Sequence, residues 1–124
     1  KFEHLRIQLP PHEIAHALFY AKMFIGDSQT MTSEAAILGT PAIRLNDFVG
    51  IITVMDEKEY KYDLTYGFKS RDFDKMLNKV SELLKQDNLD SEWQKKRAKM
   101  LEKTDNVNIF LENTIHQFLN EKNT

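Results

Sequence analysis

Glycine and proline are confined to the first 67 residues of this 124-residue chain. Both residue types interrupt helices and mark turns. Their distribution therefore predicts a turn-rich first part, residues 1–68, followed by an uninterrupted helical part, residues 69–124. The residues concerned are Pro10, Pro11, Gly26, Gly39, Pro41, Gly50 and Gly67.

In the first part, short apolar segments alternate with a helical pattern. Residues 2–9 alternate and predict a strand, which Pro10 and Pro11 end before a helix that runs to about residue 21. Residues 23–25 predict a strand buried on both faces. A helix capped by Ser28 or Thr30 then ends at Gly39. Further strands are expected at 41–45 and 64–68, whereas residues 51–62 fit either a strand or a short helix.

The remaining residues repeat apolar side chains at helical spacing. They predict one helix around 73–84, a second opened by the box-like Ser91-x-x-Gln94, and a third with an apolar stripe. The stripe comprises Val107, Phe110, Leu111, Ile115, Phe118 and Leu119. We expect one α/β domain over residues 1–124: a β-α-β-α-β parallel sheet flanked by helices, with the helical C-terminal tail packed back across it.

Composition excludes several classes of protein. The chain has no cysteine, which excludes a disulfide framework, a thiolate zinc site and a cysteine nucleophile. Its 17 basic and 19 acidic residues give no general electrostatic basis for binding nucleic acid. No apolar run reaches the roughly 20 residues of a membrane span, and no signal peptide is recognisable, so we expect a cytoplasmic protein. Because it opens on Lys1, we expect a fragment of a longer chain.

His12-Glu13-Ile14-Ala15-His16 matches the H-E-x-x-H motif of zinc metalloproteases. Histidines four residues apart on a helix can share a zinc ion, with the glutamate as general base and Glu34 as a conceivable third ligand. Pro10 and Pro11, however, place His12 in the first helical turn, where a side chain is poorly anchored. We keep the zinc hydrolase as an alternative and expect two exposed histidines and no metal.

A strand that runs into Gly26 and then into a helix is a suitable site for an anion. The carboxyl end of a parallel strand is where open α/β sheets bind ligands, and the N–H groups of residues 28–31 would point from the helix N-terminus. Ser28 and Thr30 add hydroxyl groups, and Glu34 could accept the two hydroxyls of a ribose. The alternative is that Asp27 or Ser28 only caps the helix and Glu34 is solvated.

The segment 24–48 contains a G-D-S-x-T-M-x-S-E-A-A-x-x-G-x-P pattern followed by Asn46, Asp47 and Phe48. Together with the residues before it, the run from Ile7 to Leu45 resembles the carboxyl-terminal, Rossmann-like half of GT-B-type nucleotide-sugar enzymes. It is similar to UDP-N-acetylglucosamine 2-epimerases and to the peptidoglycan N-acetylglucosaminyltransferase. The resemblance is closer still to an uncharacterised bacterial and archaeal family of glycosyltransferase-like proteins.

The resemblance implies a UDP-sugar site without any other cofactor. Ser28, Gln29 and Thr30 would hold the diphosphate, Glu34 the ribose, and the backbone near 9–11 would lie beside the uracil. The epimerases have two glycines where this chain has Gln29 and Thr30. The retaining transferases often have a second glutamate where it has Gly26.

Further residues at the same edge have two interpretations each. Asn46 and Asp47 could contact the sugar or close an Asx-type turn. Arg44 could offset phosphate charge or form an ion pair at the surface. No residue is assigned as catalytic, so the general base is expected from a missing N-terminal domain and no turnover from this fragment. The third functional alternative is a non-catalytic interaction domain that self-associates as a homo-oligomer.

Overall fold

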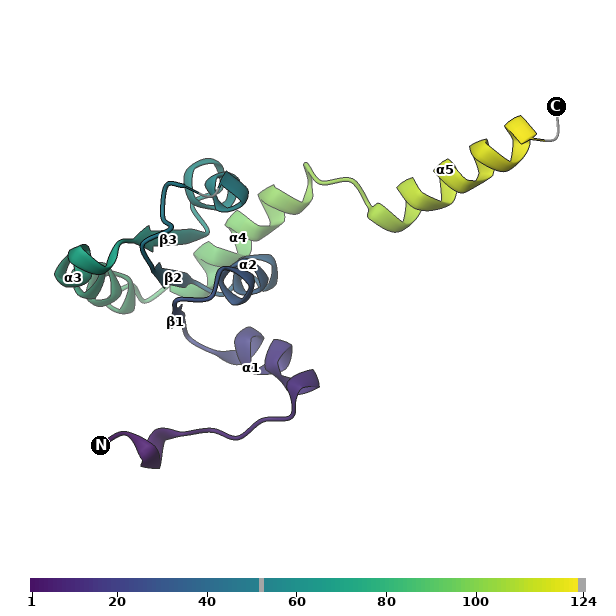
Figure 1. Ribbon diagram of the computed structural model, residues 1–124. Helices are drawn as coiled ribbons and strands as arrows, with labels where there is room; N and C mark the ends of the chain where they lie inside the picture. Colours follow the sequence, from purple (N-terminus) through teal and green to yellow (C-terminus); the bar gives the residue numbers. More distant parts are fainter. Residues whose placement is uncertain (52, 123–124) are drawn as a thin grey trace.

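The computed structural model describes residues 1–51 and 53–122 (Figure 1), so residues 52, 123 and 124 of the ranges above lie outside the described residues. A three-stranded sheet forms the centre of the described chain, and helices surround it. The elements in chain order are α1 (Ile14–Tyr20), β1 (Phe24–Gly26), α2 (Gln29–Leu38), β2 (Ala42–Leu45), β3 (Thr65–Phe68), α3 (Phe73–Leu84), α4 (Leu89–Leu101) and α5 (Val107–Lys122).

The strands are parallel and lie in the order β1-β2-β3. The central strand, β2, brings Arg44 into register with Gly26 on one side and Gly67 on the other. Consecutive strand residues point to opposite faces. Accordingly, Ala42 joins a cluster with side chains of α1 and α2, and Ile43 joins a larger one with side chains of α3 and α4. The predicted α/β class, with a small parallel sheet flanked by helices and a helical C-terminal end, is confirmed.

The predicted strand over residues 2–9 is wrong. A 3-10 turn, Glu3–Leu5, occupies part of it, and every side chain from residue 1 to residue 10 is exposed. A strand needs a neighbour for its backbone hydrogen bonds, and this segment lies away from the sheet (Figure 1). As a result β1 is an edge strand, and Ile25 is exposed rather than buried on both faces as expected.

The undecided segment 51–62 is helical in its described part. A 3-10 turn spans Thr53–Met55 and a π-helical turn spans Glu57–Lys61. These turns bury Met55, Glu59 and Tyr62. The segment thus covers part of the sheet instead of extending it.

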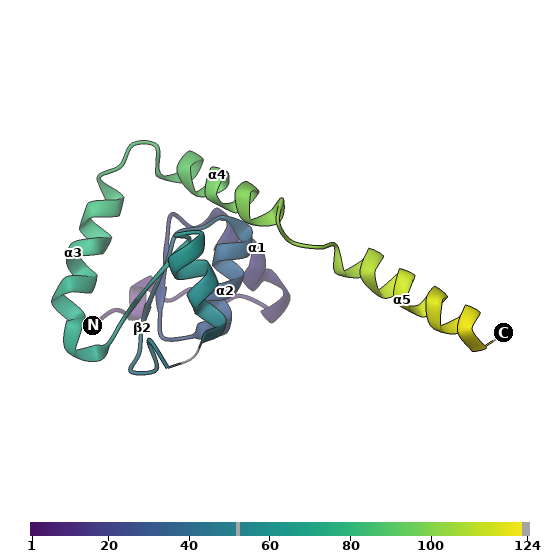
Figure 2. The same ribbon diagram turned by 90° about the horizontal axis from the view of Figure 1, so that it is seen from above.

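Two predictions about the helical part are also wrong. The second helix begins at Leu89, two residues before the proposed box, because Leu89 is fully buried and the Ser91 hydroxyl donates to the Asn88 carbonyl inside the helix. The third, α5, does not pack on the sheet. It extends away from the rest of the chain (Figures 1 and 2), and its described side chains are exposed. In the part of the chain that the structure describes, no helix combines the length and apolar character needed to cross a membrane.

Candidate functional site

The turn between β1 and α2 is fixed by Ser28. Its Oγ accepts a hydrogen bond from the Met31 N–H at 3.3 Å, so Ser28 is the N-cap of α2. Its carbonyl accepts two more, from the Thr32 N–H at 3.1 Å and the Thr32 hydroxyl at 2.6 Å. Of the predicted capping residues Asp27, Ser28 and Thr30, the structure therefore selects Ser28. The Met31 N–H, expected to point at an anion, is already used by this cap.

Three backbone donors remain open at the start of α2. Among the described residues, the N–H groups of Ser28, Gln29 and Thr30 have no hydrogen-bond partner. The side-chain Nε2 of Gln29 is buried and also has no partner in this part of the chain. An N-terminus with free N–H groups and a positive helix dipole favours a negative charge.

A cavity of about 240 Å³ lies beside these donors. Two of the predicted residues, Gln29 and Thr30, line it together with Ser33 and Met55, which the sequence did not indicate. Glu34 is exposed and lies outside this lining, although it follows Thr30 by one helical turn and so shares its face. The structure therefore places two of the three proposed phosphate residues at the cavity, whereas Ser28 and the proposed ribose residue Glu34 lie outside its lining.

Asn46 and Asp47 make contacts within the protein. The Asn46 side chain donates to the Asp27 carbonyl at 2.8 Å and accepts from the Phe48 N–H at 3.1 Å. It thereby forms the Asx-type turn and ties the loop after β2 to the turn after β1. Asp47 accepts from the Ser70 N–H at 3.0 Å, and hydrogen bonds from Ser70 lower the pKa of its carboxyl group.

Arg44 forms a buried ion pair instead of a surface pair. Its guanidinium is 1% exposed and donates to Glu59 Oε1 at 3.0 Å. Its Nε and Nη1 have no partner among the described residues. Burial raises the pKa of Glu59, although the charge of Arg44 and its hydrogen bond act in the opposite direction. Because Arg44 is in register with Gly26, this buried cation lies on the strand next to the turn that precedes α2.

The H-E-x-x-H residues are divided between two elements. His12 and Glu13 lie in the 3-10 turn Pro11–Glu13, whereas His16 lies in α1. Glu13 contacts both rings, at 2.9 Å from His16 Nδ1 and 3.7 Å from His12 Nε2. Both histidines are exposed, and the described chain has no group of three or more metal-binding side chains. This arrangement supplies no third ligand, from Glu34 or any other described residue.

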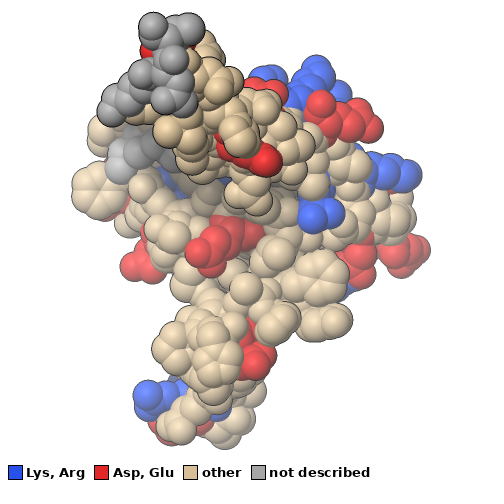
Figure 3. Space-filling model, turned by 90° about the vertical axis from the view of Figure 1, so that its right-hand side faces the viewer, with Lys and Arg blue, Asp and Glu red and all other residues tan. Residues whose placement is uncertain are grey.

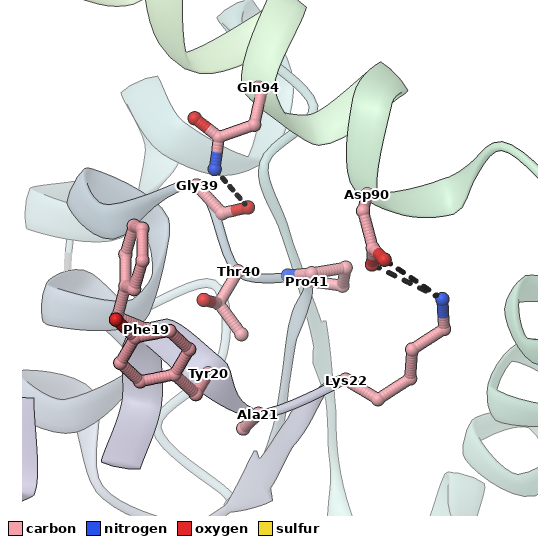
Figure 4. Close-up of a pocket in the computed structure, with 9 residues that line it drawn as sticks. All are labelled: Phe19, Tyr20, Ala21, Lys22, Gly39, Thr40, Pro41, Asp90 and Gln94. Carbon is pink, nitrogen blue, oxygen red and sulfur yellow. Dashed lines mark hydrogen bonds and ion pairs between the residues drawn. The ribbon is translucent and has the colours of Figure 1, made fainter. Parts of the chain in front are cut away.

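A second cavity, of about 310 Å³, lies at the opposite edge of the sheet, between α1, the α2–β2 connection and α4 (Figure 4). Its polar side chains are already paired. Lys22 Nζ lies 3.2 Å from both carboxylate oxygens of Asp90 (Figure 4). Gln94 donates to the carbonyls of Leu38 and Gly39, and Thr40 donates to the Leu18 carbonyl. This cavity therefore offers a ligand fewer open donors than the start of α2.

The face shown in Figure 3 carries acidic and basic side chains intermixed.

The fold and the site together define an α/β domain with an open helix N-terminus at the carboxyl edge of a parallel sheet. Comparisons of the chain with protein-family models, with curated proteins and with solved structures found no match.

Proposed function

We propose that this chain binds a nucleoside diphosphate sugar of the UDP type, with the diphosphate at the N-terminus of α2. The observation that carries the proposal is the group of unpaired donors there: three backbone N–H groups and the buried Nε2 of Gln29. Thr30, which also carries a hydroxyl group, lines the same cavity. Such donors compensate phosphate charge without further rearrangement, and in a reaction they would stabilise a diphosphate leaving group.

The size of the cavity indicates that this chain would form only part of a nucleotide-sugar site. Its volume of about 240 Å³ is below the range of roughly 300–1,000 Å³ that encloses a small molecule. A nucleotide sugar would therefore project beyond this chain toward a second, N-terminal domain of the same protein, which would supply the general base. The parent would be a cytoplasmic glycosyltransferase or epimerase, and the chain alone would show weak binding and no turnover.

Titration calorimetry with UDP, UMP and UDP-N-acetylglucosamine tests the proposal. We expect binding in the high micromolar to millimolar range, weaker for UMP because it lacks the second phosphate. The decisive variant is Gln29→Glu, which adds a negative charge beside the phosphates while a carboxylate in the first turn favours the helix. The expected loss of binding is at least tenfold.

Gln117→Glu is the matched control, because it makes the same substitution on α5, far from the site. It should bind UDP as the wild type does. Equal UDP binding by the wild type and Gln29→Glu, or no binding at millimolar UDP, would overturn the proposal. A third variant, Glu34→Gln, should reduce the preference for UDP over its 2′-deoxy analogue if Glu34 accepts the ribose hydroxyls.

A further inference from the structure

Helix α5 is separated from the rest of the molecule. A five-residue connection, 102–106, follows α4, and from there α5 extends away from the sheet and its covering helices (Figures 1 and 2). The helix has its own start signal, because Asn106 Oδ1 accepts from the N–H groups of Asn108 and Ile109 at 3.0 and 3.4 Å. It is therefore a defined helix whose described side chains are all exposed.

One half of the α5 surface is apolar. At 100° per residue, six apolar side chains fall within half of the helix circumference. The other half is polar apart from Ile109 and carries Glu112, Asn113, His116, Gln117 and Asn120. We call these six side chains the α5 stripe: Val107, Phe110, Leu111, Ile115, Phe118 and Leu119. Each of them is at least 50% exposed. Ile109 is also exposed but lies on the opposite side of the helix.

A helix of this sequence needs a packing partner. Isolated helices of about 12–15 residues are marginal in water even when they are rich in alanine. This 16-residue helix contains no alanine and several β-branched residues and asparagines, which are weaker helix formers. Contiguous exposed apolar surface on a soluble chain marks an interaction site.

We propose that the α5 stripe packs against the α5 stripe of a second copy of this chain. Burying one apolar side chain of this size contributes about 1.5–3 kcal/mol. At about 25 cal/mol per Å², this energy corresponds to an area on the order of 100 Å² removed from water. If all six side chains on each of two helices were completely buried, the contact would cover at most roughly 1,200 Å², the lower end of the range for specific protein interfaces. One stripe is sufficient on each copy, because a twofold axis pairs identical surfaces.

Charge does not oppose this pairing. Among the described side chains of α5, the acidic residues are Glu112, which lies just outside the arc of the stripe, and Glu121, which falls within the arc but in the last turn of the helix. The central turns of the stripe, around Thr114, therefore carry no charge, and an identical stripe can pack there without opposing charges. A pair of antiparallel helices crossing near Thr114 would bury both stripes, and their dipoles would oppose favourably.

Two isoleucine variants test the proposal by sedimentation velocity over a concentration series of the full chain. We expect the wild type to approach twice its 14.6 kDa mass at about 100 μM. Ile115→Glu places a charge in the stripe and should leave a monomer. Ile109→Glu makes the same change on the opposite side at nearly equal exposure, 56% against 57%, and should still dimerise. Circular dichroism checks that both variants keep the folded body.

Crosslinking identifies the occupant of the stripe. Because the chain has no cysteine, a single introduced one reports a single contact. Thr114→Cys lies inside the stripe and should oxidise to a disulfide-linked dimer, whereas Asn113→Cys, on the polar side, should not. A monomeric wild type at 100 μM would overturn the proposal. So would equal crosslinking of the two cysteine variants, or dimers that survive Ile115→Glu, because either result would assign the contact to another surface such as residues 1–10.

Discussion

At the scale of single residues, the most consequential charged contact is the buried ion pair of Arg44 and Glu59. It joins the central strand to the π-helical turn Glu57–Lys61, and both side chains are almost fully withdrawn from water. Gly67, on the neighbouring strand, leaves the space for it: a Cβ there would come within 2.8 Å of Glu59 Oε1. The pair therefore fixes how the segment between β2 and β3 lies on the sheet.

Removing the charge of one partner should destabilise the fold strongly. Glu59→Gln leaves the Arg44 guanidinium buried without a countercharge, and we expect the free energy of unfolding to fall by about 3 kcal/mol. The double variant Arg44→Met/Glu59→Leu removes both charges and should recover most of that loss. Urea unfolding followed by circular dichroism measures both. A double variant as unstable as Glu59→Gln would show that packing, and not the unpaired charge, causes the loss.

Asp47 should make stability depend on pH. The Ser70 hydrogen bonds lower the pKa of Asp47 below its ordinary value of 3.8 in the folded state. The ionised group therefore stabilises the fold above pH 3.8, and this contribution is lost as the pH falls through the lowered pKa. Asp47→Asn should accordingly be less stable than the wild type at pH 7. The difference, measured by thermal unfolding, should shrink below pH 4; a constant difference would contradict the assignment.

At the scale of elements, the end of α2 determines how α4 packs. Gly39 has a φ of +80° and terminates α2, and a Cβ at this position would meet the side chains of Gln94 at 2.5 Å and Arg97 at 2.8 Å. Both of these α4 side chains also donate to the last carbonyls of α2. Gly39 is thus required both for its left-handed backbone conformation and for the space that the α4 side chains occupy.

Gly39→Ala and Gly50→Ala separate these two requirements. Gly50 has the same φ of +80°, but a Cβ there would meet nothing within 4 Å. Gly50→Ala should lower the free energy of unfolding only by the strain of the left-handed backbone, about 1–2 kcal/mol. Gly39→Ala should cost more, because α4 must also shift. Urea unfolding compares them, and equal losses would mean that the α4 side chains simply move aside.

Elements bounded by strong local signals could be predicted from the sequence. α2 follows from Ser28 and Gly39, and α3 follows from the regular spacing of residues such as Met76 and Leu83. The failures all depended on distant contacts. Residues 2–9 alternate like a strand but have no neighbour to pair with. Similarly, the burial of Leu89 against the core starts α4 earlier than the local capping pattern indicates.

The candidate site could be predicted only in part for the same reason. Gln29 and Thr30 belong to one local turn, so their grouping follows from the sequence. Ser33 and Met55 join the cavity through tertiary structure, and Met55 lies in the segment left undecided between strand and helix. Nothing local distinguished Arg44 as buried, because its partner Glu59 lies 15 residues further along the chain.

At the scale of the whole molecule, the described chain consists of a packed body and the extended helix α5. The two hydrophobic clusters take their buried residues from α1 through α4 and the sheet with its turns, and none from α5. The body should consequently fold without α5.

Deleting residues 107–124 tests this independence. At low protein concentration, where self-association contributes little, the truncated chain should unfold within about 2 °C of the wild-type midpoint, because it loses no buried contact. Differential scanning calorimetry measures the midpoint. A shift of 5 °C or more would show that α5 stabilises the body after all.

Trp93 is the one tryptophan of the chain, and its fluorescence distinguishes the body from α5. Its ring is 1% exposed in the larger cluster, its Nε1 donates to the Leu64 carbonyl at 2.8 Å, and Lys96 Nζ lies 3.9 Å from the ring centroid. Its emission therefore reports the solvation of the body and is insensitive to α5. Far-ultraviolet ellipticity, by contrast, sums all the helices. On dilution, the helical signal should thus fall by the contribution of α5 alone, while the wavelength of maximum emission stays constant.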